Sequence, residues 1–127
     1  MKVLVDSSAW IEYLEGSELG KKVRELIISN NEIYSLSIII AEVVSKVKRT
    51  HMNAELAYET IISNSLIINT SSETAKQAGL LHAELKNKIN GFSLADAFIL
   101  TSARQLKASI LTKDSHLQRF KEAIKLK

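Results

Sequence analysis

The chain has 127 residues, of which 46% are apolar, and a formal net charge of +3. This length suits one domain with a buried core and is too short for two ordinary domains. The absence of Cys excludes disulfide bonds and thiolate metal sites, and the modest positive charge permits an anionic partner without identifying it. The apolar stretch 36–44 contains Ser37 and Glu42 and is far shorter than the roughly 20 residues of a membrane-spanning helix.

Short apolar segments alternate with amphipathic segments along the whole chain. The first strand is predicted at 2–6, and Ser7 and Ser8 are expected to cap a helix that begins near Ala9. The other predicted strands are 32–36, 66–69, 108–112 and 124–126. The other predicted helices are 18–28, 37–49, 54–63, 71–88, 93–106 and a short one after 117. This alternation predicts a single α/β domain over residues 1–127, with a short, mainly parallel central sheet flanked by helices on both faces.

Four acidic residues occupy positions that a ligand site would use. Asp6 and Asp114 each follow a predicted strand, and ligands of parallel sheets bind outside the carboxyl ends of the strands. Glu42 and Asp96 fall in about the first turn of helices that begin at the same edge. The sequence therefore predicts that four carboxylates from distant parts of the chain meet in one crevice.

Each of these acids also has a purely structural interpretation. Asp6 and Asp114 are typical of turns and helix N-caps. Asp96 follows Ser93 at the spacing of a capping box, in which the acid accepts a hydrogen bond from a backbone N–H. Glu42 is an acid near a helix N-terminus, where it complements the helix dipole.

The surroundings of Glu42 and Asp96 favour a metal site over these separate roles. Both acids stand among apolar residues without a Lys or Arg, so we expect them to be partly buried, which is costly without a cationic partner. Because His51, His82 and His116 are expected to be isolated surface residues, the ligands would all be oxygens, which favours Mg²⁺ or Mn²⁺ over Zn²⁺. Carboxylate clusters that hold such ions suit phosphodiester hydrolysis.

Four segments of the sequence resemble the PIN domain family, and particularly its VapC-type toxins. The segments are Val3-Leu4-Val5-Asp6-Ser7-Ser8, Ile39-Ile40-Ala41-Glu42-Val43, Ser93-Leu94-Ala95-Asp96-Ala97-Phe98-Ile99 and Leu111-Thr112-Lys113-Asp114. They arrive in the order of the family, and the resemblance covers essentially the whole chain.

This resemblance implies a metal-dependent endoribonuclease that uses Mg²⁺ or Mn²⁺ and leaves a 5′-phosphate and a 3′-hydroxyl. By the likeness, Asp6, Asp96 and Asp114 would bind metal directly, and Glu42 would bind through water or act as a base. Ser8 and Thr112 would hold carboxylates or water in place. Many members carry a further acid after the last motif, where this chain has Ser115-His116-Leu117, so a second metal is in doubt.

The resemblance also implies partners: an RNA substrate, a homodimer, and an antitoxin that lies across the acidic crevice. The N-terminus lacks the layout of a signal peptide, so a cytoplasmic location without membrane contact is expected. A response-regulator receiver domain is disfavoured because one acid, not two, follows the first strand, and a haloacid-dehalogenase-like phosphatase because Ser8 stands where it needs a second Asp. The remaining alternative is a catalytically silent module of the same fold that binds RNA or protein.

Overall fold

A five-stranded sheet forms the centre of the molecule, of which the computed structural model describes residues 1–126. All paired strands are parallel, in the order β3-β2-β1-β4-β5. The strands are β1 (Lys2–Val5), β2 (Glu32–Leu36), β3 (Leu66–Ile68), β4 (Ser109–Thr112) and β5 (Ala123–Lys125). Because β1 lies in the middle of this order, it is covered on both faces, and its residues Val3, Leu4 and Val5 are fully buried.

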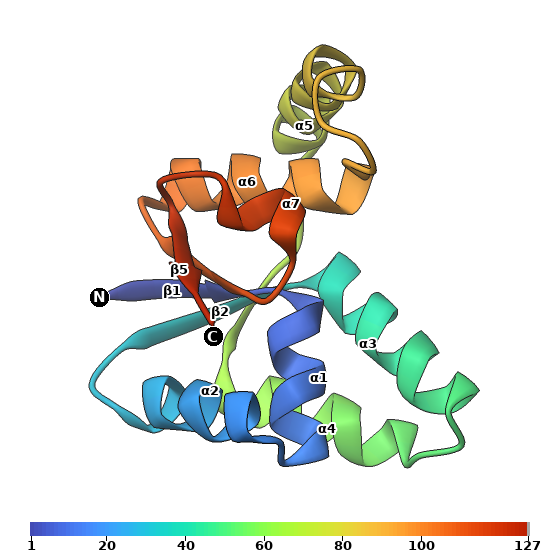
Figure 1. Ribbon diagram of the computed structural model, residues 1–127, viewed down its shortest axis with the longest axis vertical. Coiled ribbons are helices and arrows are strands. Elements are labelled where there is room, and N and C mark those ends of the chain that lie inside the picture. Colours follow the sequence, from blue (N-terminus) through green and yellow to red (C-terminus); the bar gives the residue numbers. More distant parts are fainter. Residues whose placement is uncertain (127) are drawn as a thin grey trace.

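Helices cover both faces of the sheet, as the sequence predicts. Within residues 1–126 they are α1 (Ser7–Glu15), α2 (Glu18–Ile28), α3 (Ser37–Arg49), α4 (Ala54–Asn64), α5 (Ser72–Leu85), α6 (Leu94–Leu106) and α7 (Ser115–Gln118). Figure 1 shows α1, α2 and α4 on one side of the sheet and α5 and α6 on the other. The expectation of a single α/β domain with a parallel sheet is confirmed. No helix in this part of the chain has both the length and the apolar character needed to cross a membrane.

Buried polar contacts fix α1 against the sheet. Trp10 on α1 is fully buried, and its Nε1 donates a hydrogen bond to the Ser35 hydroxyl on β2 over 3.0 Å. Ser35 in turn accepts a hydrogen bond from Ser65, which precedes β3. An indole N–H is costly to bury without an acceptor, so this chain of contacts holds the start of α1 close to the central strands.

Three predicted helix bounds are wrong. The short helix predicted after residue 117 is α7, which already begins at Ser115. The first helix begins at Ser7 and not near Ala9, so Asp6 is its N-cap residue, while Ser7 and Ser8 belong to its first turn. The helix predicted at 71–88 ends at Leu85, because the chain turns there to bury Ile89 and Phe92. The prediction for the C-terminal tail extends to Lys127, which lies outside the described residues.

Gly20 on α2 lies directly against the backbone of α1, and substituting it tests this packing. A Cβ on Gly20 would lie 2.0 Å from the backbone oxygen of Glu12. We expect Gly20→Ala to lower the free energy of unfolding by at least about 2 kcal/mol, in spite of the better helix propensity of Ala. Gly79 is a matched control, since nothing lies within 4 Å of its added Cβ.

Gly79→Ala should raise stability by up to about 1 kcal/mol. Urea unfolding of both variants measures the difference, and equal effects on stability would contradict the close packing of α1 on α2.

Candidate active site

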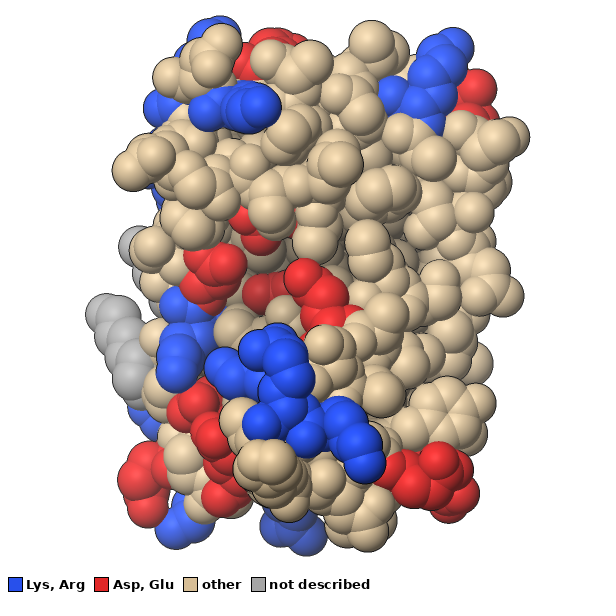
Figure 2. Space-filling model, turned by 90° about the vertical axis from the view of Figure 1, so that its right-hand side faces the viewer, with Lys and Arg blue, Asp and Glu red and all other residues tan. Residues whose placement is uncertain are grey.

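The carboxyl edge of the sheet gathers the acidic residues singled out in the sequence. Strands β1 and β4 pair directly, with Val5 opposite Leu111, and the backbone N–H of Asp6 donates to the Leu111 carbonyl over 3.0 Å. Asp6 and Asp114, which follow these two strands, are thereby brought to the same edge. Figure 2 shows acidic side chains in the hollow at the middle of this face, with basic side chains immediately beside them.

Two hydroxyl groups hold the buried carboxylate of Asp6. Thr112 Oγ1 donates to Asp6 Oδ2 over 2.8 Å, and Ser8 Oγ donates to the same oxygen over 3.1 Å. The two hydroxyls also accept hydrogen bonds from the backbone that follows β4: Thr112 from the N–H of Asp114, and Ser8 from the N–H of Lys113. The hydroxyls therefore fix Asp6 and the Asp114 loop relative to each other.

Asp96 and Asp114 both cap helices, as their structural interpretation predicts. Asp96 is buried and forms a complete capping box, accepting from the Ser93 N–H over 2.9 Å while Ser93 Oγ accepts from the Asp96 N–H over 3.0 Å. Asp114 is half-buried and accepts from the N–H of His116 over 2.8 Å. Capping uses only part of the hydrogen-bonding capacity of a carboxylate, so these roles leave both acids able to bind a ligand.

His116 is not the isolated surface residue that was expected. Its Nδ1 lies 2.9 Å from Asp114 Oδ1 and 3.8 Å from Asp96 Oδ2. One ligand atom from each of Asp96, Asp114 and His116 can be chosen so that all lie within 4.8 Å of one another. The residues at this edge that could hold a metal ion therefore include an imidazole beside the carboxylates, which the sequence did not predict.

Glu42 differs from its prediction in position and in exposure. It lies in the second turn of α3, which has no acid in its first turn, and the residue as a whole is exposed. The helical period turns the neighbouring Ile39 and Val43 into the core instead. The Glu42 carboxyl nevertheless reaches the same acidic group, because Asp6, Asp96 and Asp114 all act on its pKa.

Burial and neighbouring negative charges raise the pKa values of Asp6, Asp96 and Glu42. Burial, opposed in part by the Thr112 and Ser8 hydrogen bonds, raises the pKa of Asp6, and the charge of Asp114 adds to the rise. Burial is also the main cause of the raised pKa of Asp96, with Asp114 contributing again. The pKa of Glu42 is raised first by partial burial of its carboxyl and then by Asp6. The four carboxylates thus form one electrostatically coupled group.

No basic side chain of the described residues neutralises this group. Among the ion pairs within residues 1–126, neither Lys nor Arg contacts any of the four acids, and His116 is the one potentially cationic partner. Buried acids with raised pKa values that form no ion pair with Lys or Arg favour a bound cation. The donor set of carboxylates and one imidazole fits a divalent ion such as Mg²⁺ or Mn²⁺.

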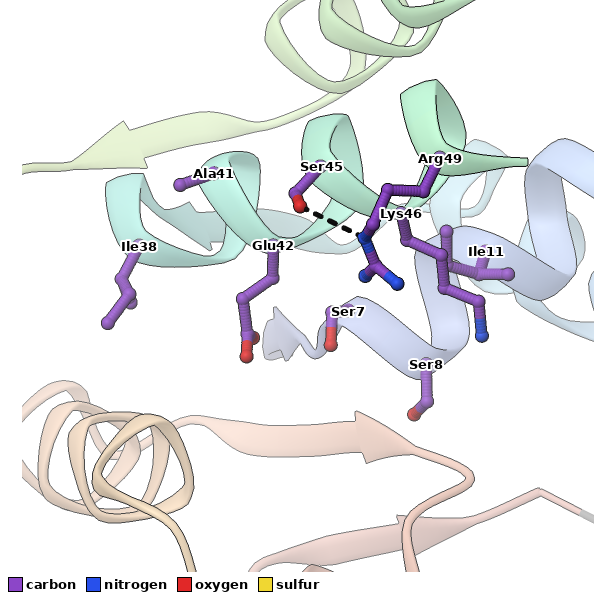
Figure 3. A pocket seen from close by; sticks show the side chains of 9 residues that line it. All are labelled: Ser7, Ser8, Ile11, Ile38, Ala41, Glu42, Ser45, Lys46 and Arg49. Atoms are coloured by element: carbon purple, nitrogen blue, oxygen red, sulfur yellow. Dashed lines mark hydrogen bonds between the residues drawn. The ribbon is translucent and has the colours of Figure 1, made fainter. Parts of the chain in front are cut away.

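A cavity of about 500 Å³ between α1 and α3 adjoins the acids. Ser7, Ser8 and Glu42 line it at the end nearest the sheet, and Lys46 and Arg49 line the other end (Figure 3). The Nε of Arg49 donates to Ser45 Oγ over 3.3 Å. Only the packing of α3 on α1 brings Lys46 and Arg49 into one cavity with Glu42.

Comparison with known proteins assigns the family. A sequence model of the PIN domain matches residues 3–123. The chain belongs to the PIN domain family. The matched residues include Asp6, Glu42, Asp96 and Asp114. This PIN domain gathers the four acids at the carboxyl edge of its sheet.

Solved structures agree with this PIN fold. A toxin–antitoxin complex from Klebsiella pneumoniae contains a chain with 24% identity and a TM-score of 0.76, with 98% of each chain covered. VapBC2 from Rickettsia felis, bound to a promoter DNA fragment, gives 21% identity and a TM-score of 0.76, covering 98% of this chain and 96% of the other. VapC20 from Mycobacterium tuberculosis, a sarcin-ricin loop cleaving toxin, gives 15% identity and a TM-score of 0.78, covering 92% and 93%. Comparison with curated protein sequences gives no match.

The raised pKa of Asp6 predicts how stability depends on pH. Because burial raises this pKa in the folded state, ionisation of Asp6 lowers the free energy of unfolding at every pH above the unfolded-state value. In EDTA, we expect Asp6→Asn to melt a few degrees above the wild type at about pH 8, because the amide oxygen still accepts from Thr112. The difference should shrink as the pH falls toward about 3, which is below the unfolded-state pKa, so that the wild-type carboxyl is mostly protonated in both states.

Thermal melts of the two proteins across this pH range provide the measurement. Glu73→Gln, at an exposed acid in the first turn of α5, controls for the loss of one negative charge. If the melting temperature of Asp6→Asn exceeded that of the wild type by more at low pH than at high pH, the Asp6 carboxylate would be stabilised by its partners and not destabilised by burial.

Proposed function

We propose that this PIN domain is a metal-dependent endoribonuclease and the toxin of a toxin–antitoxin pair. The observation that carries the proposal is the coupled group of Asp6, Glu42, Asp96 and Asp114, whose charge no Lys or Arg within residues 1–126 balances. Membership of the PIN family and the VapC-type solved neighbours support the assignment to RNA cleavage.

The proposal gives separate tasks to the four acids. Asp6, Asp96 and Asp114 would hold Mg²⁺ or Mn²⁺, and a divalent ion bound there neutralises phosphate charge and lowers the pKa of water. Glu42, which has a raised pKa and faces the cavity, would accept the proton of the attacking water. Ser8 and Thr112 would keep Asp6 in its binding orientation through the two hydrogen bonds to Oδ2.

The basic end of the cavity would bind the RNA backbone. Lys46 and Arg49 are one turn apart on α3 and share the cavity with Glu42. A phosphate next to the scissile one could therefore contact these side chains while the scissile phosphate lies at the acids. Basic side chains in such a position contribute affinity that falls with rising salt concentration.

The toxin–antitoxin complexes among the solved neighbours support an antitoxin as partner. We propose that a segment of the antitoxin lies across the acidic crevice and blocks it, and that the toxin works as a homodimer in the cytoplasm. A basic side chain in that segment would supply the cation that residues 1–126 do not place against the carboxylates.

Replacing Asp96 tests the nuclease directly. Incubated with a mixed RNA pool and Mg²⁺ or Mn²⁺, the wild type should cleave RNA, and EDTA should abolish cleavage. Asp96→Asn should lower the rate by more than about 100-fold, since even an indirect metal partner commonly contributes 10- to 100-fold. Asn at this position keeps an oxygen that can accept from the Ser93 N–H, so the fold should persist.

Glu73→Gln provides the control, because it removes an acid from the first turn of another helix, where the side chain is exposed. Cleavage that is equal in Asp96→Asn and wild type would indicate a contaminating nuclease. Absence of cleavage in every sample, together with retained RNA or protein binding, would favour the silent binding module.

Removing the basic end of the cavity should weaken substrate binding and leave the chemistry largely intact. For the double variant Lys46→Ala and Arg49→Ala, we expect KM for RNA to rise about tenfold or more, with little change in kcat. The dependence of log KM on log salt concentration should become shallower by about one to two, one for each lost phosphate contact.

Lys21 and Arg24, which are exposed on α2 outside this cavity, give a charge-matched control double variant. The same change of salt dependence in both double variants would mean that only the net charge matters, and that the cavity does not bind RNA.

A further inference from the structure

His116 is placed where a ligand of the proposed metal ion would be. It is the second residue of α7, and its side chain is 35% exposed, so it is accessible from the crevice. Its Nδ1 is directed at two carboxylates that come from different elements, Asp114 before α7 and Asp96 in the first turn of α6. An ordinary N-terminal helix residue needs neither contact.

The distances suit one shared ion. Two ligand atoms that each lie about 2.1 Å from one cation are about 3.0 Å apart when the angle at the cation is a right angle. They are about 4.2 Å apart when they lie on opposite sides of the cation. His116 Nδ1 lies 2.9 Å from Asp114 Oδ1 and 3.8 Å from Asp96 Oδ2. Both values lie close to or within this interval, so the spacing of His116 Nδ1 from each carboxylate is compatible with one shared ion.

Gly91 holds the imidazole ring in this position. A Cβ on Gly91 would lie 2.7 Å from His116 Nε2 and 3.0 Å from Cε1, so the ring rests against the bare glycine backbone. Gly91 also has a φ of +81°, a conformation that other residues rarely adopt. Its segment leads into Ser93 and the capping box of Asp96. The same turn therefore positions both the His116 ring and the carboxylate opposite it.

We propose that His116 supplies a nitrogen ligand to the divalent ion beside Asp96 and Asp114, and that the site therefore prefers Mn²⁺ over Mg²⁺. As a ligand, His116 would take the imidazole tautomer with its proton on Nε2, which leaves the Nδ1 lone pair for the ion. Imidazole favours transition metals, whereas Mg²⁺ selects oxygen ligands. This inference rests on the metal dependence in the proposed function and names the ligand that would set the choice of metal.

Pulsed electron paramagnetic resonance of bound Mn²⁺ tests the proposal on the full chain. The wild type should show a ¹⁴N coupling of coordinated imidazole, and protein containing ¹⁵N-histidine should show the corresponding ¹⁵N coupling. His116→Asp should still bind Mn²⁺ without this coupling, and competition titrations should show the Mn²⁺ to Mg²⁺ affinity ratio falling by about tenfold or more. His116→Gln, which has no imidazole, should also lack the coupling.

His51→Asn is the matched control. His51 is exposed beyond the end of α3 with a φ of +61°, which Asn tolerates better than most residues, so the ¹⁴N coupling should remain. Mn²⁺ bound without nitrogen coupling in the wild type, or coupling that persists in both His116 variants, would overturn the role of His116 and leave the ribonuclease proposal standing. If the wild type binds neither Mn²⁺ nor Mg²⁺, this inference and the metal dependence fail together.

Discussion

The parallel pairing of β1 with β4 is the contact on which the acidic edge depends. It sets Val5 opposite Leu111, so that the first residue after β1, Asp6, lies beside Thr112 at the end of β4. Strand side chains alternate between the two faces of a sheet, and a shift of one residue would turn Thr112 away from Asp6. The burial of Val5 and Leu111 on the central strands opposes such a shift. The core therefore fixes the register, and the register fixes the site.

Structural and chemical roles coincide in Asp96 and Asp114. Each accepts a hydrogen bond from a backbone N–H at a helix N-terminus, and this contact restricts the directions in which its carboxylate can point. A carboxylate that is already oriented loses less conformational entropy when it binds a ligand than a free surface acid does. The capping interpretation and the metal interpretation of these acids are thus complementary: capping supplies the orientation, while burial and, to a smaller extent, the charge of Asp114 raise the pKa of Asp96.

Local pattern predicts the elements well and side-chain contacts poorly. The bounds of α2 and β2 agree with the sequence prediction, because their apolar residues recur at the period of one structure only. The length of α5 does not agree, since Ala78 is its one fully buried side chain and packing, which the local pattern does not contain, decides where a weakly buried helix ends. The four acids could be selected from their positions after strands and in helices. The contact of His116 with Asp96 could not, because the two residues are 20 positions apart and meet only when α7 packs beside α6.

The hydrogen bond between Asp6 and Thr112 joins residues that are 106 positions apart. During synthesis, β1 emerges from the ribosome long before the β4 strand that pairs with it. A nascent chain that stops short of Asp114 can hold at most three of the four carboxylates, and it lacks the hydroxyl of Thr112 if it ends before β4 is complete. The acidic edge is thus assembled only after β4 has been synthesised, when nearly the whole domain is available to fold around it.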